Sequence, residues 1–425
     1  MLSINKVYCW IFILAFATLV PSIHLLKFVD ELMVLLMACL VVLDVLVNRS
    51  VKRYKLLWII VGIMVFYMVY TIFFMKYNTM EAIIYDFVAE LKPFCYFCVG
   101  YAIKPKFNKT EKRILRDISI FNSALMLCLF VTNLHEEVVF HVAFLGLVSI
   151  ISFLVYLLVT VDENGKLSKK ELLTAILILT VGLVSTRSKF YGEYVLALSM
   201  LFFYRPGFMK NIKISHIIGL VAIIVLVFVV AWSKIDYYFI SGGQEGQAFD
   251  EDLLETFARP MLYAGMVMIL LMHPILGSGL ASFATFASST AVNYSGLYRE
   301  IGLDQIWGLS PQFDEFICDA FYPSLAQFGI VGIILFIVFF VWLFRSMNIC
   351  LHSSGKINYI IGVMSIIIVL IESVAGTTFT QSAGAVCMMI LGYLLSDYRV
   401  LSKTAKKEIL ELPYKEQGSL DYIKK

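Results

Sequence analysis

The chain has few charged residues for its length, and this scarcity excludes an ordinary soluble domain. Charged side chains make up 15% of its 425 residues and hydrophobic ones 60%, whereas soluble domains have about 25% and about 45–50%. We therefore expect an all-α polytopic membrane protein, because a helix satisfies its own backbone hydrogen bonds inside lipid. The net charge of only +3 gives no reason to expect a nucleic acid partner.

The chain also lacks the features of a removed leader and of a metal site. Only Lys6 precedes the first apolar run, 7–24, and no small-residue cleavage site follows that run. We therefore expect a retained first helix rather than a signal peptide. Cys39, Cys128 and Cys387 lie inside apolar runs, where a thiol behaves as a small hydrophobic group. We expect no disulfides, no metal and no cofactor.

Long apolar runs are what the chain has in quantity. A membrane helix crosses about 30 Å of hydrocarbon, and twelve segments are expected to do so. The expected spans are 7–24, 31–47, 56–74, 82–103, 114–133, 138–160, 172–186, 190–204, 217–233, 326–344, 358–378 and 382–396. Nine membrane helices therefore fall in residues 1–233 and three in residues 326–396.

The basic residues predict the orientation of these spans. If the N-terminus is cytoplasmic, the inner segments, together with the polar tail 397–425, hold 26 of the 34 Lys and Arg residues. Cytoplasmic loops carry such an excess of Lys and Arg in membrane proteins. Both termini are therefore expected on the cytoplasmic side. Eight basic residues then lie outside or near outer helix ends, namely Lys27, Lys76, Lys92, Arg187, Lys189, Lys234, Arg259 and Arg299.

One long external loop is expected between the ninth and tenth spans, at residues 234–325. Its segment Met261–Leu280 is apolar enough to be a thirteenth span. A crossing there would move the seven basic residues of the C-terminal tail to the outside, against the charge rule. We therefore expect a short amphipathic or re-entrant helix inside the loop, and long ordered loops commonly carry function.

Arg187 and Lys189 lie at the external end of the seventh span, where the charge rule disfavours them. The planar guanidinium group suits phosphate oxygens, and an ammonium group adds a point charge. The pair is therefore a candidate site for a phosphorylated lipid. The alternative is an arginine that reaches lipid headgroups, with Glu193 as the structural counter-ion of the pair.

The long loop holds further candidates for substrate binding. Arg259 begins the apolar helix, Arg299 follows it, and His273 closes it. A capping or hydrogen-bonded structural role is the alternative for the histidine. Gly277 and Gly279 form a G-x-G without the strand-turn-helix context of a phosphate loop, so we expect a tight turn.

Asp314, Glu315 and Asp319 are concentrated at the end of the loop. If this segment is helical, Glu315 and Asp319 share a face. A carboxylate at the boundary of an external cavity can act as a general base, because burial and a nearby cation tune its pKa. The alternative is a solvated acidic loop end.

Further charged candidates fall within the expected spans themselves. Asp86, Glu90 and Lys92 lie in span 82–103, where they either line a polar cavity or lie at the external interface. Asp44 and Glu372 are further intramembrane carboxylates with the same two interpretations.

Three stretches, taken in order, resemble a known family. They are "LVSTRSKFYGEYV", "ARPMLYAGMVMILLMHPILGSGLASF" and "FYPSLAQFGIVGIILF". Together they resemble the O-antigen polymerase and O-antigen ligase superfamily over roughly residues 172–345. The twelve-span layout and the long external loop agree with that family, whereas the first six spans add only hydropathy.

The resemblance implies a metal-independent glycosyltransferase on the outer face of the bacterial cytoplasmic membrane. Its donor and acceptor would be oligosaccharides linked to undecaprenyl pyrophosphate, and the implied partners are membrane lipid, a chain-length regulator and a flippase. Arg187 and Arg259 match the external arginines that hold the diphosphate in this family, with Lys189 beside them.

The chain departs from the family where many ligases have a His-Asn pair. The corresponding region reads "CDAFYPSLAQFG", with Asp319 near the histidine's place. This departure favours a repeat-unit polymerase over a ligase, with Asp319 or else Glu315 as the base. A ligase, or a flippase for the lipid-linked unit, is the alternative. Transporters tend to have repeated halves and broken helices, and the sequence has no evident internal repeat.

Overall fold

The computed structural model describes residues 3–23, 28–49, 51–135, 138, 142–162, 165–204, 232 and 258–396. No β-strand occurs within these ranges. The α-helices are α1 (Ile4–Ala17), α2 (Leu19–Ile23), α3 (Phe28–Asn48), α4 (Lys55–Tyr70), α5 (Met80–Ile103), α6 (Lys109–Val131), α8 (Ala143–Thr160), α9 (Lys169–Val181), α10 (Ser188–Phe203), α13 (Ala258–Met272), α14 (Leu297–Glu300), α15 (Gly329–Glu372) and α16 (Ser382–Leu395). The shorter elements are η1 (Val51–Tyr54), the π-helix η2 (Thr71–Met75), η3 (Gly182–Ser185), η6 (Phe286–Ser288), η7 (Tyr322–Phe328) and η8 (Thr378–Thr380).

Long apolar helices indicate a multi-pass membrane protein. Five helical stretches of the described chain have the length and composition to cross a membrane. They are Val51–Met75, Lys109–Val131, Ala143–Thr160, Tyr322–Asn348 and Gly355–Glu372. The count of twelve spans stays a prediction. The ninth expected span, 217–233, has only residue 232 within the described ranges, and the tail 397–425 lies outside them.

Local sequence signals begin and end several of these helices. Asn108 and Glu111 form a capping box at the start of α6, and Ser168 and Glu171 form another at the start of α9. Each box satisfies backbone N–H groups that have no partner inside the helix. The long helix α15 breaks at Gly355, where φ is +82°. That break separates the two spans expected at 326–344 and 358–378.

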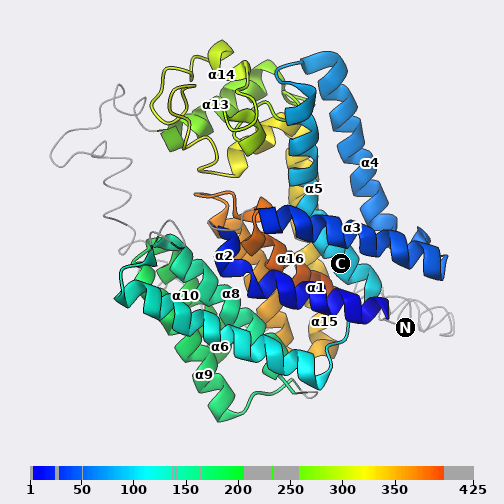
Figure 1. Ribbon diagram of the computed structural model, residues 1–425, viewed down its shortest axis with the longest axis vertical. Helices are drawn as coiled ribbons and strands as arrows, with labels where there is room; N and C mark the ends of the chain where they lie inside the picture. The colour runs from blue at the N-terminus through cyan, green and yellow to red at the C-terminus, as the bar shows by residue number, and fades with distance from the viewer. Residues whose placement is uncertain are drawn as a thin grey trace, which may run out of the picture.

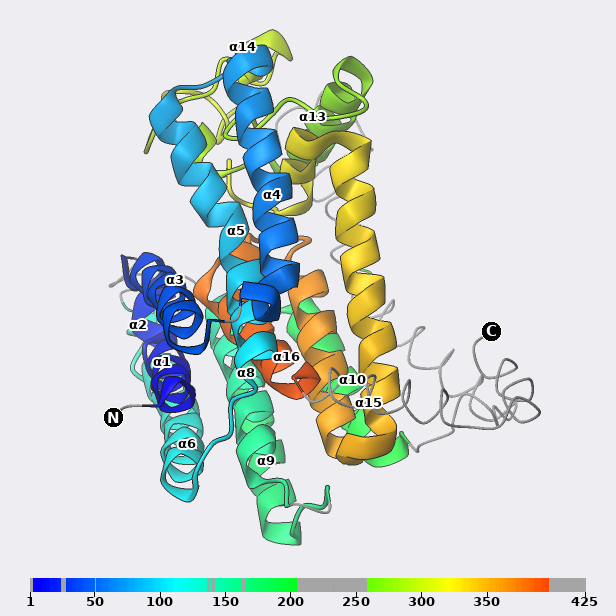
Figure 2. The same ribbon diagram turned by 90° about the vertical axis from the view of Figure 1, so that its right-hand side faces the viewer.

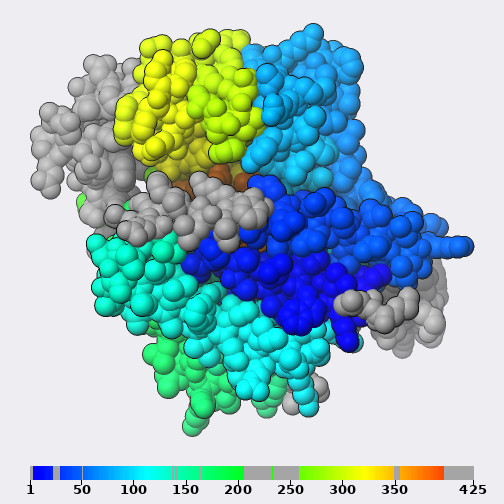
Figure 3. All heavy atoms as spheres, viewed as in Figure 1, coloured from blue at the N-terminus to red at the C-terminus, as the bar shows by residue number. Residues whose placement is uncertain are grey.

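Helices α4, α5 and the first half of α15 run side by side, and the segment 258–328 lies at one end of them (Figures 1 and 2). In Figure 3 that segment and the neighbouring ends of α4 and α5 form one continuous surface. The remaining helices, among them α1, α6, α8 and α9, lie towards the other end (Figure 2).

Helix α5 passes through the middle of this arrangement. It has 24 residues, which is long enough to cross a membrane, but it contains the buried charged side chains of Asp86, Glu90 and Lys92. Its close neighbour is α16, because a Cβ added at Gly392 would lie 2.5 Å from the carbonyl oxygen of Phe97. Small residues permit such close helix contacts in membranes.

Hydrogen bonds fasten the segment 273–328 to the α4–α5 connection. The amide nitrogen of Asn78 donates to the carbonyl oxygens of Ala281 at 2.7 Å and Asn293 at 2.9 Å. The hydroxyl of Thr71, in the π-helix that follows α4, accepts from the backbone N–H of Leu280 at 2.8 Å. These bonds fix the loop that contributes Asp319 to the site described below.

Gly277 and Gly302 provide a matched test of this packing, since φ is +73° at both. A Cβ at Gly277 would lie 2.2 Å from the carbonyl oxygen of Ala326, whereas a Cβ at Gly302 would meet nothing within 4 Å. We expect Gly302→Ala to cost about 1–2 kcal/mol from left-handed strain alone, and Gly277→Ala to cost more. Thermal unfolding of the purified variants in detergent measures the difference. A Gly277→Ala protein as stable as Gly302→Ala would contradict this packing.

Candidate functional site

Arg259 and Asp319, which the sequence analysis gave separate roles, form an ion pair. The guanidinium group of Arg259, at the start of α13, contacts the carboxylate of Asp319, which precedes η7. Burial raises the pKa of Asp319, whereas Arg259 and Lys189 lower it. The expected diphosphate ligand and the expected base are therefore direct partners.

Lys189 forms the second ion pair of the site. Its ammonium group, on the first turn of α10, contacts the carboxylate of Glu372 at the end of α15 and donates to the carbonyl oxygen of Ala375 at 3.4 Å. The expected counter-ion, Glu193, is instead buried, and its carboxylate oxygens have no hydrogen-bond partner among the described residues. Lys189 therefore forms its ion pair with Glu372, while Glu193 is near enough only for an electrostatic contribution from the lysine.

We call Arg259, Asp319, Lys189 and Glu372 the ion-pair cluster. The positive charge of Lys189 lowers the pKa of Asp319, so the two ion pairs lie close to each other. Arg187, which is two residues from Lys189 in sequence, occupies the N-cap position of α10. Three of the sequence-predicted residues, Arg187, Lys189 and Arg259, are thus at or next to helix N-termini.

Three other predicted residues have no hydrogen bond or ion pair to this cluster. His273 follows the last residue of α13, and its Nε2 lies 2.9 Å from the hydroxyl of Tyr77, which matches the structural alternative for the histidine. Arg299 is exposed on α14, and Glu315 is exposed. Residues 310–319 form turns rather than a helix, so Glu315 and Asp319 do not share a helical face.

Aromatic packing explains why the end of the loop is not helical. The rings of Trp307 and Phe313 stack with centroids 4.5 Å apart. Gly308 has a φ of +90°, and a Cβ there would lie 2.3 Å from the ring of Phe316. A left-handed glycine under a ring favours a tight turn.

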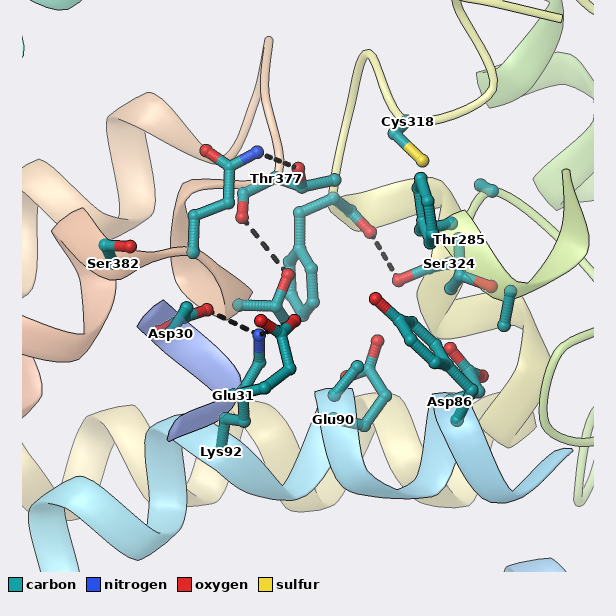
Figure 4. Close-up of a pocket in the computed structure, with 18 of the residues that line it drawn as sticks. Asp30, Glu31, Asp86, Glu90, Lys92, Thr285, Cys318, Ser324, Thr377 and Ser382 are labelled. Carbon is teal, nitrogen blue, oxygen red and sulfur yellow. Dashed lines mark hydrogen bonds and ion pairs between the residues drawn. The ribbon is translucent and has the colours of Figure 1, made fainter. Parts of the chain in front are cut away.

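A cavity of about 310 Å³ lies beside the ion-pair cluster. Its lining comes mainly from α3, α5, the loop around η6, the segment 318–324 and the segment 377–383, with one residue each from α2 and α8. Figure 4 shows carboxyl groups of α3 and α5 on one side and hydroxyl groups on the other. We call it the acidic cavity, because the charged residues that line it are Asp30, Glu31, Asp86, Glu90 and Lys92.

Most of the charged groups in the acidic cavity already have partners. The ammonium group of Lys92 lies 2.5 Å from the carboxylate of Asp30 and 3.8 Å from that of Glu31. The carboxylate of Asp86, only 1% exposed, accepts from the backbone N–H of Ala281 at 2.7 Å. These contacts join α3, α5 and the loop around the cavity.

Glu90 is the exception among these groups. Its side chain is 5% exposed and points from α5 into the cavity (Figure 4). It has no hydrogen bond or ion pair within the described part of the chain. Lys92 acts on it only through the electrostatic field, so this carboxyl group is available for a hydrogen bond with a molecule that enters the cavity.

Two segments connect the acidic cavity with the ion-pair cluster. Cys318 and Phe321 line the cavity, and Asp319 between them pairs with Arg259. The backbone N–H of Phe321 donates to the carbonyl oxygen of Ser373, at 3.1 Å, next to Glu372. Asp319 itself does not line the cavity, but its neighbours in the chain do, so the cavity and the ion-pair cluster are connected through this segment.

Sequence reasoning missed the contribution of α3 to this site. Asp30 and Glu31 are 62 and 61 positions from Lys92 in the chain, and no motif links them. Cys95 and Cys98 on α5 have the Cys-x-x-Cys spacing that can indicate a redox or metal site, but both thiols are free. No cluster of three or more His, Cys, Asp or Glu residues that could hold a metal occurs within the described ranges.

Comparisons of the chain with protein families, with characterised proteins and with solved structures find no match. The family resemblance of its three motifs therefore stays a prediction. Function is inferred below from the residues themselves and from their geometry.

Proposed function

We propose that this chain is a polysaccharide repeat-unit polymerase, a glycosyltransferase of the cytoplasmic membrane. Its substrates are oligosaccharides linked to undecaprenyl pyrophosphate, which serve as both donor and acceptor on the outer face. The observation that supports this proposal most directly is the ion pair between Arg259 and Asp319. It joins a cation suited to a diphosphate with a carboxylate suited to a base.

We propose the following reaction for these two groups. The hydroxyl oxygen of the acceptor sugar bonds to the anomeric carbon of the donor, and its proton passes to the carboxylate of Asp319. The bond between the anomeric carbon and the diphosphate oxygen breaks, and undecaprenyl pyrophosphate leaves with the bonding electrons. Arg259, with Lys189 and Arg187 nearby, stabilises the negative charge that develops on the leaving group.

The ion pair also couples donor binding to activation of the acceptor. Because Arg259 lowers the pKa of Asp319, a diphosphate that takes over the guanidinium group raises that pKa. A carboxylate with a higher pKa is a stronger base. In this proposal Asp319 therefore gains basicity when the donor is bound.

The glycan profile of a deletion strain tests the proposal. We expect single lipid-linked repeat units to accumulate on the outer leaflet, because units would still be exported but not joined. The lipid-linked intermediates are sized and assigned to a leaflet by accessibility to an impermeant enzyme. Long chains retained on the lipid carrier would indicate a ligase instead. Single units held on the inner leaflet would indicate a flippase and overturn the polymerase proposal.

A further inference from the structure

The acidic cavity has the chemistry of a saccharide site. Carboxylate and hydroxyl oxygens accept hydrogen bonds from sugar hydroxyl groups, and the cavity presents both kinds. Its lining also includes two aromatic side chains, Tyr85 and Phe286, with ring centroids 5.5 Å apart. Such rings offer flat apolar faces to the C–H face of a pyranose. The volume of about 310 Å³ lies at the lower end of small-molecule sites.

The position of the cavity indicates which sugar would occupy it. In the sequence, Asp319 lies between Cys318 and Phe321, which line the cavity, and its carboxylate pairs with Arg259 on α13. A hydroxyl group that gives its proton to Asp319 must come within hydrogen-bond distance of it. The sugar that bears this hydroxyl group fits the cavity side, whereas the diphosphate fits the side of the arginine.

The charges of the cavity restrict the class of that sugar. Among the described residues, four carboxyl groups and one ammonium group line it, and that ammonium group, Lys92, is already engaged with Asp30 and Glu31. Glu90 points into the cavity and makes no hydrogen bond or ion pair with another described residue. Because these carboxyl groups outnumber the one ammonium group, a sugar carboxylate would meet acidic surroundings, whereas hydroxyl, acetamido and ammonium groups can donate hydrogen bonds to Glu90.

We infer that the acidic cavity binds the terminal sugar of the acceptor glycan and selects a neutral or amino sugar over an acidic one. The assignment to the acceptor rests on the proposed polymerase function. The preference for neutral and amino sugars rests on the cavity alone, so it is measured by binding without any polymerisation.

Titration of methyl glycosides tests the inference with the full chain purified in lipid nanodiscs. The probes are the neutral, amino and uronic acid forms of glucose, galactose and mannose, and ligand-observed NMR gives each Kd. In at least one of the three series we expect the neutral and amino forms to bind at least about tenfold more tightly than the uronate. Absence of binding in every series, or equal binding of the uronate, would overturn the inference.

Three variants locate the effect. Glu90→Gln keeps the shape but removes the free carboxyl group, so the discrimination against uronates is expected to narrow. Glu81→Gln is the matched control, because Glu81 is exposed near the start of the same helix and does not line the cavity. Phe286→Ala is expected to raise the Kd of every sugar that binds, by a similar factor for each. This variant tests the site even if Glu90→Gln fails to fold. Unchanged affinities in both cavity variants would show that the sugars bind elsewhere.

The binding result is separable from the proposed function. If the neutral sugars bind as expected but the deletion strain shows no defect in joining repeats, the cavity is a saccharide site of a different activity. If the strain shows the polymerase defect but no sugar binds, the function stands and the acceptor occupies another part of the protein.

Discussion

An Asp319→Asn protein is expected to lose polymer synthesis by about 10²–10⁴-fold, the usual contribution of a general base. Asparagine keeps the size of the side chain and can still accept a hydrogen bond from Arg259. It cannot take the proton of the acceptor hydroxyl group. The loss should therefore appear in the rate of joining repeats, while the abundance and thermal stability of the protein change little.

The assay for this variant is polymer chain length and yield in a deletion strain that expresses each protein at matched abundance. Glu315→Gln discriminates between the two bases that the sequence allowed. Glu315 is exposed and has no hydrogen bond or ion pair to Arg259 or Lys189, so its amide variant should support normal polymer. Normal polymer from Asp319→Asn, with loss of polymer in Glu315→Gln, would reverse the assignment of the base.

The apolar runs of the sequence predicted the approximate positions of several helices. The expected span 56–74 corresponds to α4 with its π-helical end, and 138–160 corresponds to α8. The start of α6 was expected at 114, but the capping box at Asn108 begins the helix at Lys109. Hydropathy detects the stretch that meets lipid, whereas polar capping sets the first residue.

The pairings within the site could not be predicted in the same way. Arg259 and Asp319 are 60 positions apart, and Lys189 and Glu372 are 183 apart. The charge rule indicated that Arg259 and Lys189 are basic residues on the side of the membrane where such residues are disfavoured. It did not indicate which carboxylates they would contact. The sequence favoured Glu193 because it follows Lys189 closely in the chain, whereas the tertiary packing brings Glu372 to Lys189. Long-range ion pairs depend on how the helices are arranged, and a single sequence contains no local signal for that.

A Lys189→Met protein is expected to be strongly destabilised, by about 3–5 kcal/mol, because it leaves a buried carboxylate without its partner. The side chain of Glu372 is only 5% exposed and that of Lys189 26% exposed. Glu193, which is fully buried and has no hydrogen-bond partner, would also lose a nearby cation. The free energy of unfolding in mixed micelles is the quantity to measure.

The double variant Lys189→Met with Glu372→Gln separates the structural role of the lysine from its role towards the diphosphate. Removing both partners of a buried pair is often nearly neutral, so most of the lost stability should return. A double variant that is stable but makes no polymer would show that the ammonium group acts on the substrate, since the fold no longer needs it. A double variant that is stable and active would confine Lys189 to neutralising the carboxylates at the end of α15. A single variant as stable as the parent protein would contradict the ion pair itself, because the buried carboxylate of Glu372 would then be tolerated without a cation.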